Sequence, residues 1–497
     1  MAYLCYDIGS SSLKAALISE EGRLLAFSRR PLSLAHGAGG SHESDARLWV
    51  EAALSAGAEA VALAKGGPGP TLEVRAIAVS GNGPTLLAAG PDGSPLGPAL
   101  SWLDRRAERE AEEVSALAGM KIDPTFYLPK ALRLWRSADE GRRRGIRWFF
   151  SCPEYLEFAL SGEAVTYLPH PGYEAYIWNA EMIAALGLPA ERFPPFIAPA
   201  AMVGKLLPAP AARLALPSGL PIVAGFPDFL AAIVGSASVE PGIACDRSGT
   251  SEGINLCAMR PFPSRALLSL PHPVAGLWNV SGGVSTAGAA LEWLAAALYP
   301  DASSMAGAGV EALLAEARGS PSGARGLVFL PYLAGERAPL WDSSRRAAFV
   351  GLALDHGRAE LARAAAESLA FGLKLASDLA LSEGMAFELL RVSGQAAGED
   401  LLCEIKAEVL GVAVEVPELR DCELAGDAAA CALALGEASS LSEAAGSLVH
   451  IRRRYEPKDP DAYKAAYAAF KAALAALEAP DQAAHARNTA SSGSARP

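Results

Sequence analysis

Two short segments about half a chain apart repeat one pattern, and this repeat constrains the fold more than any other feature. Asp7-Ile-Gly-Ser-Ser-Ser-Leu13 continues an apolar run that begins at Tyr3, and Asp246-Arg-Ser-Gly-Thr-Ser-Glu252 continues one that begins at Ile243. Each segment has the pattern of a strand, a Gly/Ser/Thr loop and a returning strand. The repeat therefore favours two similar lobes, each built around a sheet.

The rest of the chain alternates strand and helix patterns. Strands are predicted at 74–79, 85–88, 222–225, 253–257 and 389–392, and helices at 358–383, 399–410, 425–436 and 460–478. That alternation indicates an α/β protein with two lobes. We predict domains at 1–239 and 240–479, followed by a disordered tail at 480–497.

Charge and cysteine content exclude several classes of function. The chain of 497 residues carries 43 Lys and Arg against 55 Asp and Glu, a net charge of −12. Such a surface repels phosphate backbones and anionic membranes, so neither nucleic acid nor a membrane is an expected partner. The longest uncharged stretch, 266–291, is broken by two prolines, so no membrane span is predicted. Scattered cysteines and the lack of a signal-peptide pattern predict a cytoplasmic protein.

Both glycine-containing loops have the composition of an anion site. Backbone N–H groups in such turns can form a concavity that binds phosphate, and the Ser10 and Ser11 hydroxyls add donors. Lys14 can reach the same phosphate, and Asp7 can hold Mg²⁺ through water. For the first loop alone a polar β-turn is the favoured interpretation. With the second loop at 247–251, phosphate binding becomes equally favoured.

Asp228 is a carboxylate in an apolar setting. It follows the strand at 221–225 and precedes the apolar run at 229–235. Burial of a lone carboxylate costs free energy unless the group is paired, capping or catalytic. Two interpretations stay open, a catalytic carboxylate or the N-cap of the next helix.

The motifs from residue 6 to about residue 470 resemble the FGGY family of carbohydrate kinases. The resemblance is carried by short segments in the family's order, at 6–14, 77–81, 99–106, 224–228, 248–251, 287–294 and 329–339. It implies an α/β fold of two ribonuclease-H-like (actin/Hsp70-type) domains with a cleft between them.

The resemblance also implies a function, an ATP-dependent kinase that phosphorylates a primary hydroxyl of a small sugar, first of all a xylulose-like ketose. Asp228 falls at the catalytic-base position and Asp7 at the Mg²⁺ position. The implied ATP-binding residues are Ser10, Ser11, Lys14, Gly249, Thr250, Gly288, Glu292, Gly394, Gln395 and Glu399. The implied substrate contacts are Asn82, Trp102, Asp104 and Asp228. The partners expected are the sugar and ATP, for a monomer or homodimer.

Three departures from the family pattern bear on specificity. Gly81-Asn-Gly-Pro84 is shorter than the Gly-Gln-Met-His-Gly of xylulose kinases, and Phe229 makes the wall beside the base more apolar. The adenosine loop reads Ser393-Gly-Gln-Ala396 in place of Gly-Gly-x-Ala, which bears on nucleotide preference. For Asn82, a sugar ligand and a turn residue are equally favoured.

Other functions stay open at this point. They are a kinase for a polyol or sugar acid, a non-catalytic sugar or nucleotide sensor, and an actin- or chaperone-like ATPase. The altered sugar loop and Gln395 favour the sensor, whereas the segments 102–106 and 331–339 argue against the ATPase.

Overall fold

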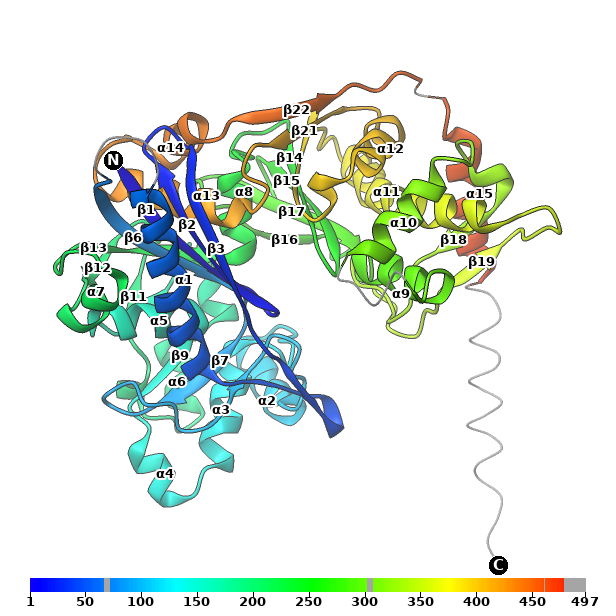
Figure 1. Ribbon diagram of the computed structural model, residues 1–497. Coiled ribbons are helices and arrows are strands. Elements are labelled where there is room, and N and C mark those ends of the chain that lie inside the picture. Colours follow the sequence, from blue (N-terminus) through cyan, green and yellow to red (C-terminus); the bar gives the residue numbers. More distant parts are fainter. Residues whose placement is uncertain (67–71, 302–306, 460, 478–497) are drawn as a thin grey trace, which may run out of the picture. The chain divides into compact units, whose positions relative to one another are not determined.

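The computed structural model forms two compact units, each assembled from separate stretches of the chain (Figure 1). The residues described are 1–66, 72–301, 307–459 and 461–477. The first unit comprises residues 1–240, 270–278 and 421–450, and the second comprises 241–269, 279–420 and the chain from 451 onward. The sequence suggested two contiguous ranges, 1–239 and 240–479, but residues 421–450 pack with the first unit. The tail predicted at 480–497 lies outside the described residues.

The sheet of the first unit has six strands in the order β12-β13-β6-β1-β2-β3. These are β1 (Ala2–Ile8), β2 (Ser12–Ser19), β3 (Leu24–Pro31), β6 (Val74–Gly81), β12 (Met202–Lys205) and β13 (Pro221–Pro227). The first three pair antiparallel, because short turns join them, whereas β6 runs parallel to β1 and β13 parallel to β6. Every residue of β1 is buried, so both faces of the sheet are covered.

The two faces of β1 meet different helices, since side chains alternate along a strand. Leu4, Tyr6 and Ile8 join a core with α1 (Ala46–Gly66) and α5 (Cys152–Ser161). The opposite face, which includes Asp7, lies on the side of α13 (Cys422–Ala434), a helix that contacts β1, β6 and β13. Alternation thus directs Asp7 away from the apolar core and toward α13.

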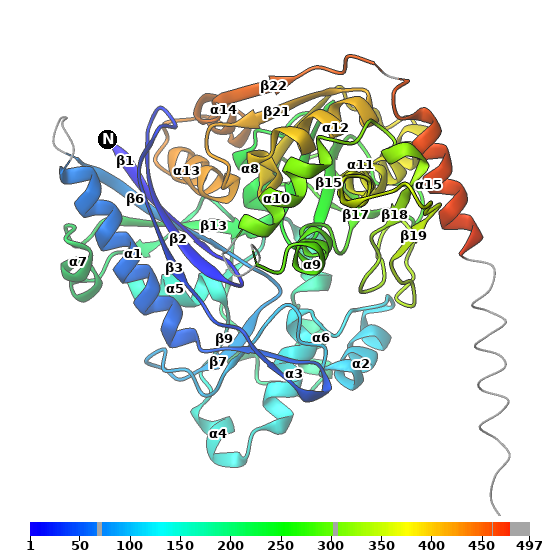
Figure 2. The same ribbon diagram turned by 45° about the vertical axis from the view of Figure 1, so that its right-hand side comes forward.

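Close helix packing explains why residues 421–450 belong to the first unit. Helix α13 lies side by side with α8 (Asp228–Gly235) (Figures 1 and 2). A Cβ at Gly235 would lie 1.8 Å from the carbonyl oxygen of Cys422, and a Cβ at Gly426 would lie 2.1 Å from that of Ala231. The two helices therefore approach more closely than larger residues would allow.

The second unit has a seven-stranded sheet whose central strands pair as those of the first unit do. Its sheet runs β16-β17-β15-β14-β20-β21-β22. The strands are β14 (Ile243–Ser248), β15 (Glu252–Ala258), β16 (Leu268–Pro271), β17 (Trp278–Val284), β20 (Leu389–Gly394), β21 (Ala413–Pro417) and β22 (Ile451–Tyr455). As in the first unit, the central strand β14 pairs antiparallel with the next strand and parallel with a later one, β20. The predicted α/β class with two similar lobes is confirmed.

The hydrogen bonds of the two hairpins correct the alignment of the repeat. The N–H of Gly9 donates to the carbonyl of Ser12 at 2.9 Å, and the N–H of Gly249 donates to that of Ser251 at 2.8 Å. Gly9 therefore corresponds to Gly249. Asp7 corresponds to Arg247 and not, as the sequence pattern suggested, to Asp246.

The repeat extends to a second pair of loops. Ile8 is in register with Gly81, and Ser248 is in register with Gly394. The N–H of Asn82 then donates to Ile8 at 2.8 Å, as the N–H of Gln395 donates to Ser248 at 3.1 Å. Val-Ser-Gly followed by an amide residue is thus one loop used in both units.

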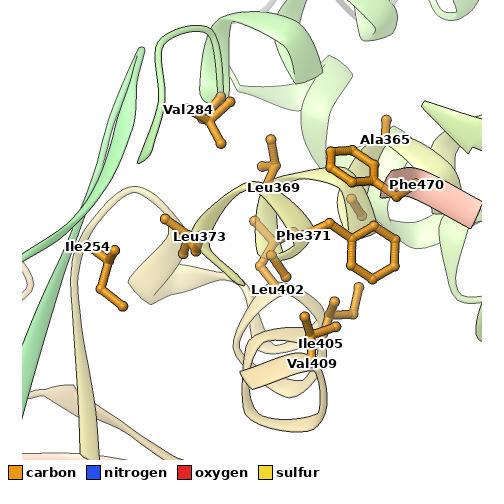
Figure 3. Close-up of a cluster of buried hydrophobic side chains, with 14 of the residues drawn as sticks. Ile254, Val284, Ala365, Leu369, Phe371, Leu373, Leu402, Ile405, Val409 and Phe470 are labelled. Carbon is orange, nitrogen blue, oxygen red and sulfur yellow. The ribbon is translucent and has the colours of Figure 1, made fainter. Parts of the chain in front are cut away.

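A large apolar core surrounds α11 (Arg358–Ser382) in the second unit. Figure 3 shows Phe371, Leu369 and Leu373 of this helix among residues from neighbouring elements. Leu402 comes from α12 (Asp400–Leu410) and Phe470 from α15 (Lys464–Ala476). The predicted helices 358–383 and 399–410 correspond to α11 and α12, and α15 lies within the predicted range 460–478, of which 460 and 478 are outside the described residues.

Further elements complete the two units. The other strands are β4 (Ala35–Gly37), β5 (Ser41–Ser44), β7 (Leu86–Ala89), β8 (Ala99–Leu100), β9 (Trp148–Ser151), β10 (Thr166–Tyr167), β11 (Phe196–Ile197), β18 (Val328–Leu330) and β19 (Ala348–Val350). The other helices are α2 (Glu108–Ala118), α3 (Tyr127–Ser137), α4 (Glu140–Gly145), α6 (Ala180–Ala185), α7 (Pro208–Leu214), α9 (Gly288–Leu298), α10 (Ala308–Ala317) and α14 (Leu441–Leu448). Among these described segments, none of the helices has the length and hydropathy needed to cross a bilayer.

Candidate active site

Asp7 and Lys14 form the centre of a charged cluster in the first unit. They are paired across β1 and β2, and Lys14 Nζ lies 3.1 Å from Asp7 Oδ2 and 2.7 Å from Asp421 Oδ1. Burial, together with the charges of Glu423 and Asp228, raises the pKa of Asp7 to about 7, although Lys14 opposes the shift. The cluster therefore concentrates several carboxylates around one cation at the end of the central strand.

Lys14 keeps its charge despite being largely enclosed. Burial lowers its pKa, but the carboxylates of Asp7, Glu423 and Asp421 outweigh burial and raise the pKa above its usual range. A permanently charged ammonium beside the Gly/Ser loop suits contact with a phosphate. Ser10 and Ser11 lie in that loop, directly before β2.

Asp228 begins α8 at the end of β13. The N-cap position belongs to Pro227, so the alternative role of Asp228 as N-cap is wrong. Its Oδ1 accepts a hydrogen bond from the N–H of Phe229 at 2.7 Å, and a carboxylate in the first turn is stabilised by the helix dipole. Its charge also raises the pKa of Asp7 and of Tyr127. Asp228 therefore interacts electrostatically with the Asp7 cluster.

The structure joins the predicted substrate segment to the predicted phosphate loop. Trp102 Nε1 donates to Ser10 Oγ at 2.8 Å, and the N–H of Trp102 donates to Thr85 Oγ1 at 3.2 Å. Residues more than 90 positions apart in the sequence are thus held together at one end of the sheet.

The side chains of Asn82 and Asp104 bind to the protein itself. Asn82 Nδ2 donates to the carbonyl of Ile8 at 2.8 Å, and its Oδ1 accepts from Thr85 Oγ1 at 2.5 Å. Asp104 is buried, accepts from the N–H of His42 at 3.0 Å and pairs with Arg106 at 2.6 Å. Burial alone would raise the pKa of Asp104, but the Arg106 hydrogen bonds hold it below its usual range. Both side chains fix loops, and their contact with substrate stays a prediction.

The Asn82→Ala substitution tests what that side chain does. Because its amide closes the loop after β6, we expect the variant to lose about 1–3 kcal/mol of stability, the cost of leaving buried partners unpaired. Because Thr85 bonds both Asn82 and Trp102, any rise in the KM for the acceptor is expected only together with this loss of stability. Thermal melts and acceptor titrations check this, and a large rise in acceptor KM with an unchanged melting temperature would instead make Asn82 a substrate ligand.

The nucleotide-side glycines of the second unit come together around Ser248. The N–H of Gly288, at the start of α9, donates to the carbonyl of Gly249 at 3.1 Å, and that of Ala289 donates to Thr250 at 3.2 Å. A Cβ at Gly288 would lie 2.3 Å from the Gly249 oxygen, and Gly394 has a φ of +76° with no room for a Cβ. Only glycine fits these two positions, because a Cβ at either would clash with the backbone of Ser248 or Gly249.

The other residues predicted to contact the nucleotide lie beside the Ser248 loop or further along the chain. Gln395 and Thr250 are exposed beside it, and the Gln395 Oε1 lies 3.4 Å from where a Gly288 Cβ would be. Glu292 is exposed further along α9, and Glu399 immediately precedes α12. Burial raises the pKa of Glu399, and Glu311 and Asp400 add to the shift.

Sequence reasoning missed the acidic residues of α13. Asp427 is fully buried, accepts from Ser80 Oγ at 2.8 Å, and has a pKa raised well above its usual value by burial and by the charge of Asp7. Glu423 acts on Asp7 and Lys14 through its charge. Their spacing of four residues places Glu423 and Asp427 on one helix face, and that spacing was the available signal.

Two similar α/β units, each with a Gly/Ser/Thr hairpin at its central strand, define the class of this chain as a two-domain α/β protein. Residues 2–235 match the N-terminal domain of the FGGY family of carbohydrate kinases, and residues 247–435 match the C-terminal domain of that family.

Known proteins of similar length agree with this match. The chain is 30% identical to a glycerol kinase of Geobacter sp. (strain M21), over 92% of this chain and 94% of that protein. It is 25% identical to a xylulose kinase of Bacillus subtilis (strain 168), over 92% and 93% of the two chains. The structure of xylulose kinase from Rhodospirillum rubrum superposes with a TM-score of 0.80 at 26% identity, covering 96% of this chain and 99% of that one.

The chain belongs to the FGGY family of carbohydrate kinases. The prediction of a sugar kinase with two actin/Hsp70-like domains is therefore confirmed, and family membership supports ATP as its phosphoryl donor.

Proposed function

We propose that this kinase transfers the γ-phosphoryl group of ATP to a primary hydroxyl of a small sugar, first of all a xylulose-like pentulose, with Asp228 as the base. The observation that carries this proposal is the charge arrangement in the first unit. Asp228 stands at the helix start after β13, close enough to shift the pKa of Asp7, which itself holds Lys14. A proton acceptor and a phosphate-binding cation at one end of a sheet are what the reaction requires.

Each residue then has a chemical task. Asp228 accepts the proton of the attacking hydroxyl as the new O–P bond forms. Lys14 and the hydroxyls of Ser10 and Ser11 donate to phosphate oxygens, where negative charge develops in transfer. In the second unit, Thr250 and the backbone at Gly249, Gly288 and Gly394 contact the nucleotide. The nucleotide contacts also include Glu292, Gln395 and Glu399.

The donor set of the first unit fits Mg²⁺. This cation keeps several waters and takes one or two carboxylates besides phosphate oxygens. Asp7 supplies a carboxylate at the strand end, with the charge of Asp228 nearby. In the described part of the chain no three His, Cys, Asp or Glu side chains form a cage of their own, which agrees with a hydrated ion. When bound, Mg²⁺ would neutralise phosphate charge.

A polyol is the second candidate acceptor, because the glycerol kinase relative shares more identity with this chain than the xylulose kinase relative does, 30% against 25%. A coupled ADP-release screen over ketopentoses, ketohexoses, polyols and aldonates, with ATP and Mg²⁺, decides between them. ADP release that requires a ketopentose supports the first candidate. A preference for glycerol supports the second, and sugar binding without ADP release would contradict both.

Lys14→Ala and Thr250→Ala are expected to weaken the use of ATP more than that of the acceptor. In the proposed site both side chains contact phosphate, so removing either one should raise the KM for ATP by about tenfold or more. The acceptor KM should change by less than about threefold. Steady-state kinetics with each substrate varied in turn measure the split. If both variants raised only the acceptor KM, these loops would not be phosphate sites.

We also propose a cytoplasmic enzyme that acts as a monomer or homodimer. Seven cysteines without a pairing pattern suit a reducing compartment, and all seven side chains are buried.

A further inference from the structure

A buried lysine outside the catalytic cluster holds two loops of the first unit. Lys130 lies on α3 and is fully buried. Its Nζ donates to the carbonyl of Pro84 at 2.6 Å and to that of Ser101 at 2.7 Å. Pro84 lies in the loop after β6 and Ser101 in the loop after β8. One ammonium thus links two loops that the chain itself connects only through the strands between them.

The contacts of Lys130 differ from those of the other fully buried lysine, Lys406. Lys406 pairs with two buried carboxylates, Asp246 and Glu252, so its charge is compensated directly. Lys130 instead bonds neutral carbonyls, and burial lowers its pKa to about 7 although Asp104 and Asp123 pull the other way. Keeping an ammonium at such a place is costly, and an apolar side chain would pack there at less cost. The two carbonyl bonds are therefore the reason to expect a task for this residue.

Both loops lead directly to the residues that approach the phosphate loop. Thr85, next to Pro84, accepts a hydrogen bond from the N–H of Trp102, which follows Ser101. Trp102 in turn donates from Nε1 to Ser10 Oγ at 2.8 Å. Hydrogen bonds, together with the peptide links Pro84–Thr85 and Ser101–Trp102, therefore connect Lys130 through both loops to Ser10.

We propose that Lys130 is a positioning residue, which fixes the distance between the Pro84 and Ser101 loops and thereby holds Trp102 against Ser10. This inference rests on the proposed function, because it takes the Trp102 side as the acceptor side. A lysine suits the task since its tetrahedral ammonium can donate to two converging carbonyls at once. Methionine fills a similar volume but donates nothing.

Lys130→Met is the first test, with Leu132→Ala as the matched control. Leu132 is buried on the same helix, so its truncation also destabilises α3, but it has no part in the two carbonyl bonds. Two measurements are made on the full chain. The first is amide hydrogen exchange of residues 82–85 and 99–104 without ligands. The second is kinetics with the best acceptor from the screen.

Lys130→Met is expected to speed exchange in both loops by about tenfold and to raise the acceptor KM by a similar factor, while the ATP KM changes by less than about twofold. Leu132→Ala should lower the melting temperature without these effects. Unchanged exchange, an unchanged acceptor KM, or equal effects from Leu132→Ala would each overturn the proposal.

Lys130→Gln covers the case in which Lys130→Met fails to fold. Its amide can replace one of the two hydrogen bonds, so its exchange rates and acceptor KM should lie between those of the wild type and those expected when both bonds are lost. Wild-type values for both quantities would overturn the proposal. The two possible failures are distinct. Unresponsive loops contradict the role of Lys130, whereas a wild-type enzyme that phosphorylates no acceptor contradicts the proposed function.

Discussion

Asp228→Asn is expected to lower kcat by about 10²–10⁴-fold, because the amide keeps the size of the side chain but cannot accept the proton of the attacking hydroxyl. The fold should persist, since the N-cap of α8 is Pro227 and the amide oxygen can still accept from the N–H of Phe229. ATP binding should stay within about threefold. Rapid-quench measurement of phosphoryl transfer, together with ATP titration, separates the chemical step from binding.

Asp139→Asn provides a matched control for that experiment. Asp139 is an exposed N-cap of α4, where its side chain accepts from the N–H of Arg142 at 2.8 Å. Asparagine caps as well as aspartate, so stability and kcat should both stay near those of the wild type. If Asp228→Asn kept more than a tenth of wild-type kcat, the base would have to be another group, and Asp7 would be the next to test.

Local sequence patterns predicted the helices and strands of the fold but not all of the packing between them. Apolar runs located β1 and β14, and helical apolar periodicity located α11, because burial of these segments leaves a pattern in the local sequence. Helical periodicity also located α13 but could not show which sheet this helix covers. That choice depends on the fit of Gly426 against α8, a contact between residues about 200 positions apart, which no local pattern reports.

The loops of the candidate site could be predicted from the sequence, but the pairing of its charged side chains was harder to predict. Asp7, Lys14 and Ser10 stand out because glycine-rich turns beside charged residues are visible in a linear sequence. The pairing of Lys14 with Asp421 depends on α13 and could not be read in advance. The sequence favours a sugar ligand and a turn residue equally for Asn82. Its bonds to Ile8 and Thr85 show that its side chain closes the loop, while contact with substrate stays a prediction.

Asp246 shows how a repeat can mislead. The sequence pattern aligned Asp246 with Asp7, but the hairpin register shifts it by one residue and turns its side chain to the other face of the sheet. There it lies 2.5 Å from Lys406 Nζ, which also pairs with Glu252. All three side chains are buried. Burial and the charge of Glu252 raise the pKa of Asp246 to about 8, while Lys406 lowers it.

Lys406→Met is therefore expected to destabilise the second unit by about 3–5 kcal/mol, the usual result of removing one partner from a buried ionic group. The reason is that Asp246 and Glu252 would remain as two uncompensated carboxylates. Adding Asp246→Asn and Glu252→Gln to Lys406→Met should restore much of the loss, because neutral amides tolerate burial better. Lys464→Met, which removes an exposed pair with Asp461, should cost less than about 1 kcal/mol.

The loss of stability caused by Lys406→Met should also depend on pH, and the direction of this dependence follows from the pKa of Asp246. Without Lys406 the folded-state pKa of Asp246, already about 8 in the wild type, rises further above that of the unfolded chain. The folded variant then keeps this proton at pH values where the folded wild type releases it, so the loss of stability relative to wild type grows as pH rises above about 8, by up to about 1.4 kcal/mol per pH unit. Urea unfolding followed by hydrogen exchange of second-unit peptides measures the difference from wild type at each pH. A loss that is the same at pH 7 and pH 9.5 would show that the lysine matters for packing and not for charge.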